Sequence, residues 1–357
     1  MKKMLALFYG GISPEHEVSI LSARSVYTAL NKEIFDPLLI GISKLGKFNV
    51  CTVEELMNDS VVQENKYRMS FHLAEGNPGI SWNGTFYSID CAFPILHGCG
   101  GEDGTIQGMF DLAEIPYIGC DMESSVLCMN KGITKVILQK SGIPQVPYQV
   151  LFYEKWTKNQ GEILDIESSF PYPLFVKPSH GGSSIGTSKA HNRTELLQAI
   201  HTAYIYDREI LIEKCIVGRE IECSVLGNYE VIQASPPGEI IPEREFYDYE
   251  AKYVTNDTKL MIPADLPEDM VQKIKSFACK TFSELRCYGM ARVDFFLEET
   301  TNNLYVNEIN TIPGFTAISL YPKLWEAGGL PYRSLVDRLI ELALDRKPIR
   351  NRMVKGD

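Results

Sequence analysis

The amino-acid sequence predicts an α/β protein that begins with a doubly wound parallel sheet. Three observations support this prediction. In the first third of the chain, buried apolar runs typical of strands alternate with stretches of helical periodicity. Glycine-rich turns follow several of these strands, at the ends where α/β proteins place ligand crevices. The length of 357 residues is enough for two or three domains of the usual size.

The alternating elements of the first third can be placed along the chain. Strands are expected over residues 5–9, 35–42 and 88–96, with a further short strand over residues 115–119. Helical periodicity covers residues 17–31 and 105–113, each after a turn rich in glycine. This order of strand, turn and helix favours parallel strands joined by crossover helices.

The rest of the chain is expected to mix longer helices with strands and loops. One continuous helix is expected over residues 124–140, and others over residues 193–206, 267–285 and 332–345. Strands are expected over residues 174–178, 210–214 and 220–226, and as a hairpin of residues 291–296 and 306–311. Residues 235–261 contain prolines, glycines and aromatic rings without a clear period, which indicates an ordered functional loop.

The composition is that of a globular protein and argues against some classes of function. A net charge of −11 and a pI near 5.2 disfavour non-specific binding of nucleic acid. The nine cysteines are scattered without a Cys-x-x-Cys pair, which indicates reduced thiols. The first apolar run is too short for an export signal, and no stretch is long enough to cross a bilayer. A cytoplasmic protein that binds neither nucleic acid nor membrane is expected.

The predicted hairpin carries a candidate metal site. Side chains two apart on a strand point to the same face, so Glu308 and Asn310 would lie side by side. The polar loop at residues 298–303 would bring Asp294 opposite them. Two carboxylates and an amide oxygen suit Mg²⁺ when water and phosphate complete its shell. Charged residues on a solvated strand face are the commoner explanation, so the hairpin alone leaves both interpretations open.

A glycine–serine loop indicates where a phosphate could bind. Residues 181–186 follow a strand that carries Lys177, and glycine amides, serine hydroxyls and a lysine together suit an anion. The spacing matches neither the Walker A nor the dinucleotide-binding pattern, and a flexible turn remains the alternative. Residues 245–253, with three tyrosines and Lys252, could form a lid over such a site or pack on the surface.

Other candidates are weaker on local grounds. His97 stands at a strand end, where α/β proteins place functional groups, but a lone histidine there is more often structural. Glu15 and Ser19 frame a helix start after a Gly-Gly turn, and local evidence favours an N-cap and a first-turn carboxylate. Glu213 and Glu220 are, in isolation, ordinary charged strand residues.

Taken together, the segments resemble the ATP-grasp superfamily, and within it the D-alanine–D-alanine ligases. The segments that carry this resemblance occur in the family's order and span nearly the whole chain. They are residues 10–19 (GGISPEHEVS), 96–104 (LHGCGGEDG), 175–178 (FVKP), 182–186 (GSSIG), 246–253 (FYDYEAKY), 292–294 (RVD) and 307–316 (NEINTIPGFT). The resemblance implies three domains: an amino-terminal α/β domain at residues 1–122, then two ATP-grasp domains at residues 123–211 and 212–357.

By this resemblance, one set of residues holds ATP and its metal ions. Contacts to ATP, a co-substrate, are implied for Lys131, Lys177, Ser183, Ser184, Glu213, Lys214, Ile216, Glu220, Tyr247 and Lys252. Lys131, on a predicted helix, and Lys177, on a predicted strand, would contact the phosphates, and Glu213 would contact the adenine amino group. Asp294, Glu308 and Asn310 would hold two Mg²⁺ ions, with Mn²⁺ as an alternative metal.

A second set is implied to bind and activate D-alanine. Glu15, Ser183 and Tyr253 would form a hydrogen-bonded set around the first D-alanine. Arg292 and backbone amides near Gly314 would stabilise the developing oxyanion. Ser19, His97, Ser319 and Leu320 complete the implied substrate site.

The implied reaction joins two D-alanines into D-alanyl-D-alanine through a D-alanyl phosphate, for peptidoglycan synthesis, and a homodimer is expected. The same scaffold could take D-serine or D-lactate as second substrate, and a nucleotide-binding regulator without turnover is the alternative from another class. Tyr253 and Leu320 match the D-alanine-adding pattern. In two places the sequence departs from relatives: His180-Gly181 stands where some have Arg-Glu, and Ile318 where many have His.

Overall fold

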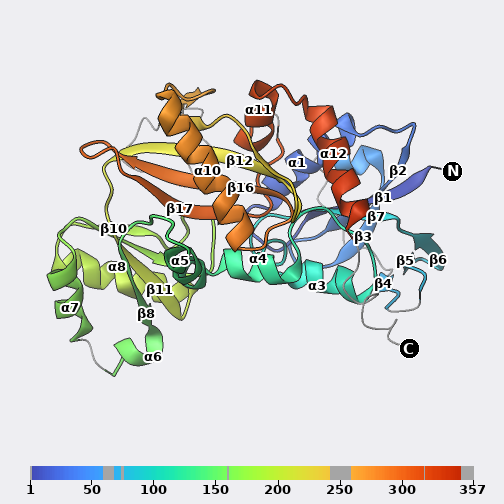
Figure 1. Cartoon of the computed structure of the whole chain (residues 1–357). Coiled ribbons are helices and arrows are strands. Elements are labelled where there is room, and N and C mark those ends of the chain that lie inside the picture. The colour runs from blue at the N-terminus through green and yellow to red at the C-terminus, as the bar shows by residue number, and fades with distance from the viewer. Residues whose placement is uncertain are drawn as a thin grey trace, which may run out of the picture.

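The computed structural model describes residues 2–58, 68–73, 76–158, 161–241, 259–316 and 318–346. These residues form four β-sheets and the helices that pack against them (Figure 1). The α/β fold class expected from the sequence is confirmed. In the ranges just given, each helix is too short or too polar to span a bilayer.

The amino-terminal sheet has the strand order β3-β2-β1-β7, with β1 (Lys3–Gly10) near its centre. β1 runs parallel to β2 (Phe35–Ile42) and to β7 (Cys91–Ile95), whereas β3 (Phe48–Cys51) is an antiparallel edge strand. Most of β1 is buried on both faces, which explains its continuous apolar sequence. The helices α1 (His16–Ala29) and α3 (Thr105–Leu112) follow β1 and β7 in the chain, so the predicted parallel sheet is present.

Short elements complete this region. α2 (Val53–Met57) begins at a capping box, and a small antiparallel sheet contains β4 (Ser70–Phe71), β5 (Gly79–Trp82) and β6 (Thr85–Ser88). The strand expected over residues 88–96 is shorter, because β6 ends at Ser88 and β7 begins at Cys91. The strand expected over residues 115–119 is reduced to one parallel bridge between Ala92 and Tyr117.

The prediction of a single helix over residues 124–140 is wrong. α4 (Met122–Met129) and α5 (Lys131–Lys140) are separate helices that meet at Asn130, whose ψ of 99° is extended. The Asn130 side chain accepts a hydrogen bond from the Ile133 amide at 2.8 Å and thereby caps α5. An asparagine favours such a cap over continuing a helix, because its side chain competes for backbone N–H groups. The break puts Lys131 at the first position of α5.

The central sheet is antiparallel and has the strand order β10-β9-β11-β8. Its strands are β8 (Tyr148–Phe152), β9 (Leu174–Pro178), β10 (Ser188–Ala190) and β11 (Glu209–Lys214). The helices near it are α6 (Tyr153–Trp156), α7 (Glu162–Ser169) and α8 (Arg193–Tyr206). Leu196, Ala199 and Ile200 of α8 pack with Val176 and Ile212 of the sheet in one buried apolar cluster.

The carboxy-terminal sheet has six strands, in the order β15-β14-β12-β16-β17, with β13 paired to β12. Its strands are β12 (Gly218–Gly227), β13 (Ile232–Ala234), β14 (Gly238–Ile241), β15 (Lys259–Met261), β16 (Gly289–Glu298) and β17 (Leu304–Asn310). α10 (Glu268–Glu284), α11 (Leu320–Ala327) and α12 (Tyr332–Asp345) complete the fold. The predicted hairpin is confirmed as β16 and β17. Two parts of the loop expected over residues 235–261 are instead the paired strands β14 and β15.

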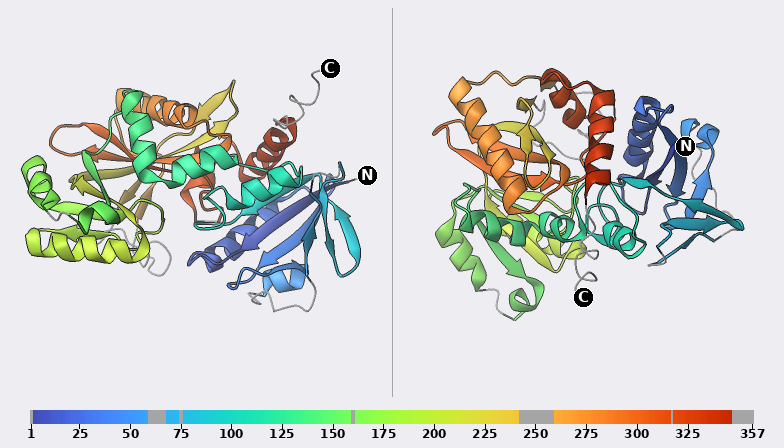
Figure 2. Two further views of the ribbon diagram at one scale, coloured as in Figure 1. Left: turned by 90° about the horizontal axis from the view of Figure 1, so that it is seen from below. Right: turned by 45° about the vertical axis from the view of Figure 1, so that its right-hand side comes forward.

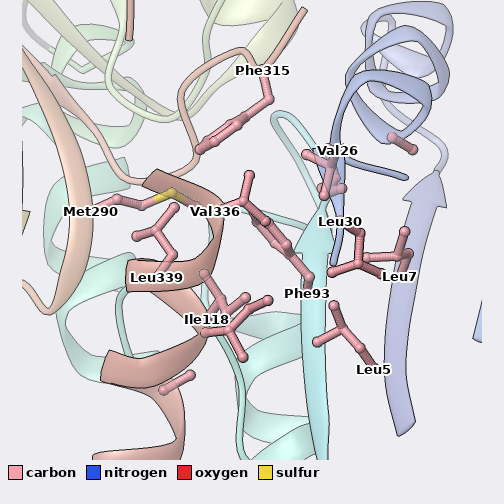
Figure 3. Close-up of a cluster of buried hydrophobic side chains, with 14 of the residues drawn as sticks. Leu5, Leu7, Val26, Leu30, Phe93, Ile118, Met290, Phe315, Val336 and Leu339 are labelled. Carbon is pink, nitrogen blue, oxygen red and sulfur yellow. The ribbon is translucent and has the colours of Figure 1, made fainter. Parts of the chain in front are cut away.

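The amino-terminal elements and the central sheet lie at opposite ends of the molecule, as both views of Figure 2 show. A large apolar cluster joins β1 and β7 to α12 and to Met290 of β16 (Figure 3). The amino-terminal sheet therefore shares its core with the end of the described chain. The division at residues 122/123 and 211/212 stays a prediction, and its second boundary falls within β11.

Leu339 of α12 lies in this shared cluster without solvent exposure. Replacement of Leu339 by alanine is expected to lower the free energy of unfolding by about 2–5 kcal/mol, through lost burial and a residual cavity. Leu164 of α7, which is 56% exposed, is the matched control, and Leu164→Ala should change stability by less than about 0.5 kcal/mol. Urea denaturation followed by circular dichroism measures both, and equal effects would contradict the shared core.

Candidate active site

A cavity of about 500 Å³ is lined by residues from both the central and the carboxy-terminal sheets. Lys177 and Glu213 come from the central sheet, and Asp294 and Glu308 from the β16–β17 hairpin. The glycine–serine loop (residues 181–186) and Lys131 of α5 also reach this space. Two lysines expected to meet phosphate and two of the expected metal ligands therefore share one cavity, whereas Asn310 lines a small second pocket together with Lys131 and Glu308.

Three carboxylates form a row across neighbouring strands at one wall of this cavity. Glu222 of β12 lies opposite Asp294 of β16, which in turn lies opposite Glu308 of β17. Opposite residues of antiparallel strands project to the same face. The predicted position of Asp294 opposite Glu308 is confirmed. Asn310 lies opposite Arg292, one step along the same face, and its Nδ2 donates to Asp294 Oδ2 at 2.9 Å.

Arg292 neutralises part of this row. Its Nε and Nη2 donate to the two oxygens of Asp294 at 2.7 and 2.8 Å, a bidentate pair. Its Nε also lies 2.8 Å from Glu222 Oε2. All three side chains are less than one-fifth exposed, so the guanidinium is held in one orientation between two carboxylates.

The donor set of the hairpin suits Mg²⁺. In the part of the chain that the structure describes, no three acidic, histidine or cysteine side chains gather closely enough to hold an ion by themselves. Mg²⁺ rarely needs that many, because it keeps several waters and takes one or two carboxylates together with substrate phosphates. Asp294, Glu308 and Asn310 supply carboxylate and amide oxygens on one face beside the cavity, and each oxygen has more than one lone pair.

Glu213 lies between two buried lysines. Its carboxylate oxygens are each 2.7 Å from a lysine nitrogen, that of Lys135 and that of Lys177. Burial alone would raise the pKa of Glu213, but the two lysines outweigh burial and lower that pKa. Burial also lowers the pKa of Lys135, against the opposing effect of Glu213. The Lys177 Nζ donates further to Asn307 Oδ1 at 3.2 Å, which links the central sheet to the hairpin.

Lys131 connects the loop to the carboxylate row. Its Nζ donates to the Gly181 carbonyl oxygen and lies 3.7 Å from Glu308 Oε2. Burial lowers the pKa of Lys131, and Glu308 acts in the opposite direction. At the first position of α5, this ammonium adds to the positive end of the helix dipole. An anion in the cavity would meet the ammonium group, whereas the first amides of α5 already donate to Ser179 and Asn130.

The glycine–serine loop has a strained backbone and reaches the amino-terminal region. Ser183 and Ser184 have φ values of 53° and 58°, a left-handed conformation that is unusual for residues other than glycine. Ser183 Oγ donates to Glu15 Oε1 at 2.6 Å across 168 residues of sequence. Two members of the predicted set around the first substrate are therefore in contact. Tyr253, the third member, and the predicted ATP contacts Tyr247 and Lys252 lie outside the described residues.

The residues expected at the nucleoside end of ATP line the same cavity. Glu213, Lys214, Ile216 and Glu220 all border it. The Lys214 backbone N–H already donates to the Pro147 carbonyl oxygen at 3.0 Å, so only the carbonyl of Lys214 could serve the adenine edge. The Lys214 side chain pairs with Glu298 at 3.2 Å. The predicted adenine and ribose contacts stay predictions.

His97 and Glu102 hold the backbone that follows β17. His97 Nδ1 contacts the Ile312 carbonyl oxygen at 2.9 Å, and Glu102 Oε1 accepts from the Ile312 N–H at 3.1 Å. Glu102 Oε2 accepts from the Gly98 N–H at 2.7 Å. Burial lowers the pKa of His97 and raises the pKa of Glu102 to about 7. These contacts tie the loop after β7 to the turn beyond Asn310.

The other predicted substrate residues fall into two places. Ser19 has no exposed surface, and its hydroxyl accepts from the Gly10 N–H at 2.8 Å and donates to the Ile95 carbonyl. The structure thus places Ser19 between β1 and β7. Ser319 precedes α11 and accepts from the Thr316 N–H at 3.0 Å, and a side chain on Gly314 would approach Ser319 Oγ to 2.7 Å. Leu320 is buried against Ile240 and Leu324.

Sequence reasoning missed three charged residues beside the site: Glu222 and Lys135, which are buried, and Glu102, which is partly buried. A signal existed for each. Glu222 alternates with Glu220 on one strand face, and Lys135 follows Lys131 by one helical turn. Glu102 lies within a glycine-rich segment that was already singled out, at the end of a strand.

Comparison with known proteins identifies relatives across most of the chain. Residues 4–120 match the family model of the D-ala D-ala ligase N-terminus, and residues 137–341 match that of the C-terminus. The D-alanine–D-alanine ligases of Caldicellulosiruptor bescii and Acetivibrio thermocellus are each 46% identical to this chain. Each alignment covers 97% of this chain and 96% of the relative.

Solved structures of similar fold belong to the same group of enzymes. The VanG D-Ala:D-Ser ligase from Enterococcus faecalis matches with a TM-score of 0.88 and 34% identity, over 96% of this chain and all of the other. The D-alanine–D-alanine ligase from Coxiella burnetii matches with a TM-score of 0.85 and 36% identity, over 99% and 97%. Sequence, fold and cavity therefore agree that this chain belongs to the D-alanine–D-alanine ligase family.

Proposed function

We propose that this protein is an ATP-dependent, ADP-forming ligase that joins two D-alanines into D-alanyl-D-alanine for peptidoglycan synthesis. Membership of the ligase family supports this reaction. The observation that carries the proposal is the single cavity that gathers buried lysines, a glycine–serine loop and a row of carboxylates. Phosphoryl transfer needs that combination, because charge on the transferred group must be neutralised and positioned.

ATP would occupy this cavity with its phosphates toward Lys131, Lys177 and the glycine–serine loop. The backbone amides of Ser183 and Ser184 and the hydroxyl of Ser184 would add donors beside these two ammonium groups, while the Ser183 hydroxyl donates to Glu15. Glu213, Lys214 and Ile216 would face the adenine, and Glu220 the ribose. Tyr247 and Lys252 would join from the segment outside the described residues.

Asp294, Glu308 and Asn310 would hold two Mg²⁺ ions, or Mn²⁺, between the hairpin and the phosphates. When bound, these ions neutralise the charge that develops on the transferred phosphoryl group. Arg292 holds Asp294 through a bidentate pair, which keeps one carboxylate oriented toward its neighbours in the row. The Lys131 ammonium group lies 3.7 Å from the Glu308 carboxylate and adds a positive charge beside it.

The first step proposed is attack of a D-alanine carboxylate oxygen on the γ-phosphorus of ATP, which forms D-alanyl phosphate and releases ADP. Glu15 would bind the ammonium group of this D-alanine. Ser183 donates to Glu15 Oε1 and thereby orients the carboxylate toward the substrate. Tyr253 would complete this set and help to exclude water, which would otherwise hydrolyse the acyl phosphate.

The second step proposed is attack of the deprotonated amine of the second D-alanine on the acyl carbon, with loss of phosphate. Arg292 and amides near Gly314 would stabilise the tetrahedral oxyanion. The amides at Ser319 and Leu320, at the start of α11, would bind substrate or the developing oxyanion, with Ser19 and His97 near the substrates. His97 and Glu102 hold Ile312, two residues before Gly314, and so support that turn.

Three further features belong to the proposal. The protein would be cytoplasmic, where ATP is available, and would form a homodimer. Its domains would comprise residues 1–122, 123–211 and 212–357. The shared core between the amino-terminal sheet and α12 supports close association of the first and last of these.

Release of ADP and phosphate from a mixture of ATP, Mg²⁺ and D-alanine tests the reaction. We expect release that depends on D-alanine and a product with the mass of the dipeptide. Release without D-alanine, or no release with it, would overturn the proposal. The complete absence of release would favour a nucleotide-binding regulator.

D-serine is the second candidate for the second substrate, because the structure of a D-Ala:D-Ser ligase matches this fold closely. Competition between D-alanine, D-serine and D-lactate at equal concentrations, followed by mass spectrometry, separates these products. D-alanyl-D-alanine should dominate. A main product containing D-lactate would remove the role given to Tyr253.

A further inference from the structure

The glycine–serine loop leaves β9 through a buried polar junction at Ser179, which has no exposed surface. The Ser179 amide donates to the Glu209 carbonyl oxygen at 2.9 Å, and the Ser179 carbonyl accepts from the Lys131 N–H at 3.0 Å. Its hydroxyl lies 3.0 Å from Glu209 Oε1 and 3.1 Å from Asn130 Oδ1. The start of the loop is thus bonded directly to the first residues of α5, where Lys131 stands.

His180 extends this junction to the end of α8. Its backbone N–H and its Nδ1 both contact Asp207 Oδ2, at 2.7 and 2.9 Å. Its Nε2 lies 2.9 Å from Asn130 Nδ2. The imidazole, half exposed, therefore bridges Asp207 on one side and the N-cap residue of α5 on the other.

The orientation of Asn130 determines which proton state of His180 fits. Asn130 Oδ1 already accepts from the Ile133 N–H at 2.8 Å as the N-cap of α5, so Asn130 Nδ2 must face His180. An amide nitrogen only donates, so the His180 Nε2 has to accept and carries no proton. The proton of the neutral ring is then on Nδ1 and is donated to Asp207. A protonated imidazole would set an N–H against the Asn130 amide.

We propose that His180 is a positioning residue that ties the glycine–serine loop to the N-terminus of α5 only while its Nε2 is unprotonated. On protonation, either the ring leaves Asn130 or the Asn130 amide turns and gives up its cap on α5. Both changes loosen the connection between the loop and Lys131, so ATP should bind more weakly in acid. This inference rests on the proposed role of Lys131 and the loop in holding the ATP phosphates.

The charged groups around His180 influence its pKa in both directions. The hydrogen bond with Asp207 raises the pKa of His180, and nearby Glu209 acts in the same direction. Partial burial and Lys131 oppose this. The folded-state pKa is therefore above its ordinary value, so the pair with Asp207 stabilises the fold most in acid and loses that contribution as the pH rises. The contact between His180 and Asn130 has the opposite pH dependence: it forms at higher pH and is lost in acid, because it requires the neutral imidazole.

The test measures the KM for ATP at saturating Mg²⁺ and D-alanine from about pH 6 to about pH 8.5, a range that brackets the histidine pKa. From the alkaline to the acidic end of this pH range, the KM for ATP of the unmodified protein should rise about fivefold more than that of His180→Gln. A factor of this size corresponds to the free energy of one N-cap contact. Titration of ATP and of D-alanine affects both proteins alike and cancels in this comparison. Asp207→Asn should move the rise to lower pH. His191→Gln, an exposed histidine, is the matched control and should keep the full rise.

Asn130→Asp provides the sharper variant. An aspartate keeps an oxygen for the Ile133 N–H but presents a second acceptor to His180, so the protonated ring becomes the favoured partner. The pH dependence of KM should then reverse relative to His180→Gln. Calorimetric titration with a non-hydrolysable ATP analogue measures binding without turnover. If every protein binds the analogue and the affinity of His180→Gln depends on pH as that of the unmodified protein does, the role of His180 is overturned. If no protein binds the analogue, the proposed ATP site is refuted instead.

Discussion

Replacement of Glu308 by glutamine is expected to lower kcat by about 10³-fold, because a neutral amide is a poorer ligand for Mg²⁺ than a carboxylate. A loss of about 4 kcal/mol in transition-state stabilisation corresponds to that factor. The variant also removes the negative partner that lies 3.7 Å from Lys131. Because glutamine has nearly the same shape and Glu308 is only partly buried, the fold should be retained.

The measurement combines steady-state kinetics with a Mg²⁺ titration. The Mg²⁺ concentration at half-maximal rate should increase, which separates loss of a metal ligand from a general loss of activity. Glu299→Gln makes the same charge change in the exposed loop of the same hairpin and should alter kcat by less than about twofold. Full activity in Glu308→Gln, or an unchanged Mg²⁺ requirement, would contradict the assignment of Glu308 as a ligand.

The fold could be predicted where local pattern and burial agree. Residues 4–9 of β1 are apolar because the two faces of the strand pack into two different clusters, and strand and helix then alternate with short turns. The break between α4 and α5 could not be read from periodicity. It depends on Asn130, whose side chain caps α5 and accepts from Ser179, 49 residues further along the chain.

The candidate site could be predicted in its residue types but not in its pairings. Asp294, Glu308 and Asn310 follow from strand alternation and one hairpin loop, which are local features. Lys135 has the sequence context of an ordinary helix lysine, and only the packing of α5 on β11 brings it to 2.7 Å from Glu213. Glu222 likewise joins the site only because β12 pairs with β16, about 70 residues further along the chain, which brings Asp294 opposite Glu222.

These unpredicted pairings also matter for energetics. Glu213 and Glu222 are buried carboxylates, and each would be costly to bury without a cation beside it. Lys135 with Lys177 offsets the first, and Arg292 offsets the second. The site therefore contains groups that hold one another in place before any ligand arrives, which is what a preorganised phosphoryl-transfer site requires.

Replacement of Arg292 by lysine is expected to lower kcat by about 10²–10³-fold, the usual cost of losing one donor to a developing oxyanion. Lysine keeps the positive charge but cannot reproduce the planar fork that reaches both oxygens of Asp294. Its shorter reach and single nitrogen must also choose between Asp294 and Glu222. KM for ATP should change by less than about threefold, because the interaction lost is made in the transition state.

The matched control is Arg193→Lys, since Arg193 also forms a forked pair with a carboxylate, that of Glu167, but its side chain is exposed and does not line the cavity. Its kcat should remain within about twofold, because exposed ion pairs contribute little. Comparing kcat with KM for ATP and for D-alanine decides how Arg292 acts. A large rise in KM for ATP with little change in kcat would mean that Arg292 serves nucleotide binding through Asp294. A fall in kcat alone would mean that the guanidinium stabilises the oxyanion formed at the acyl carbon, and Glu222 would then help Asp294 to hold it there.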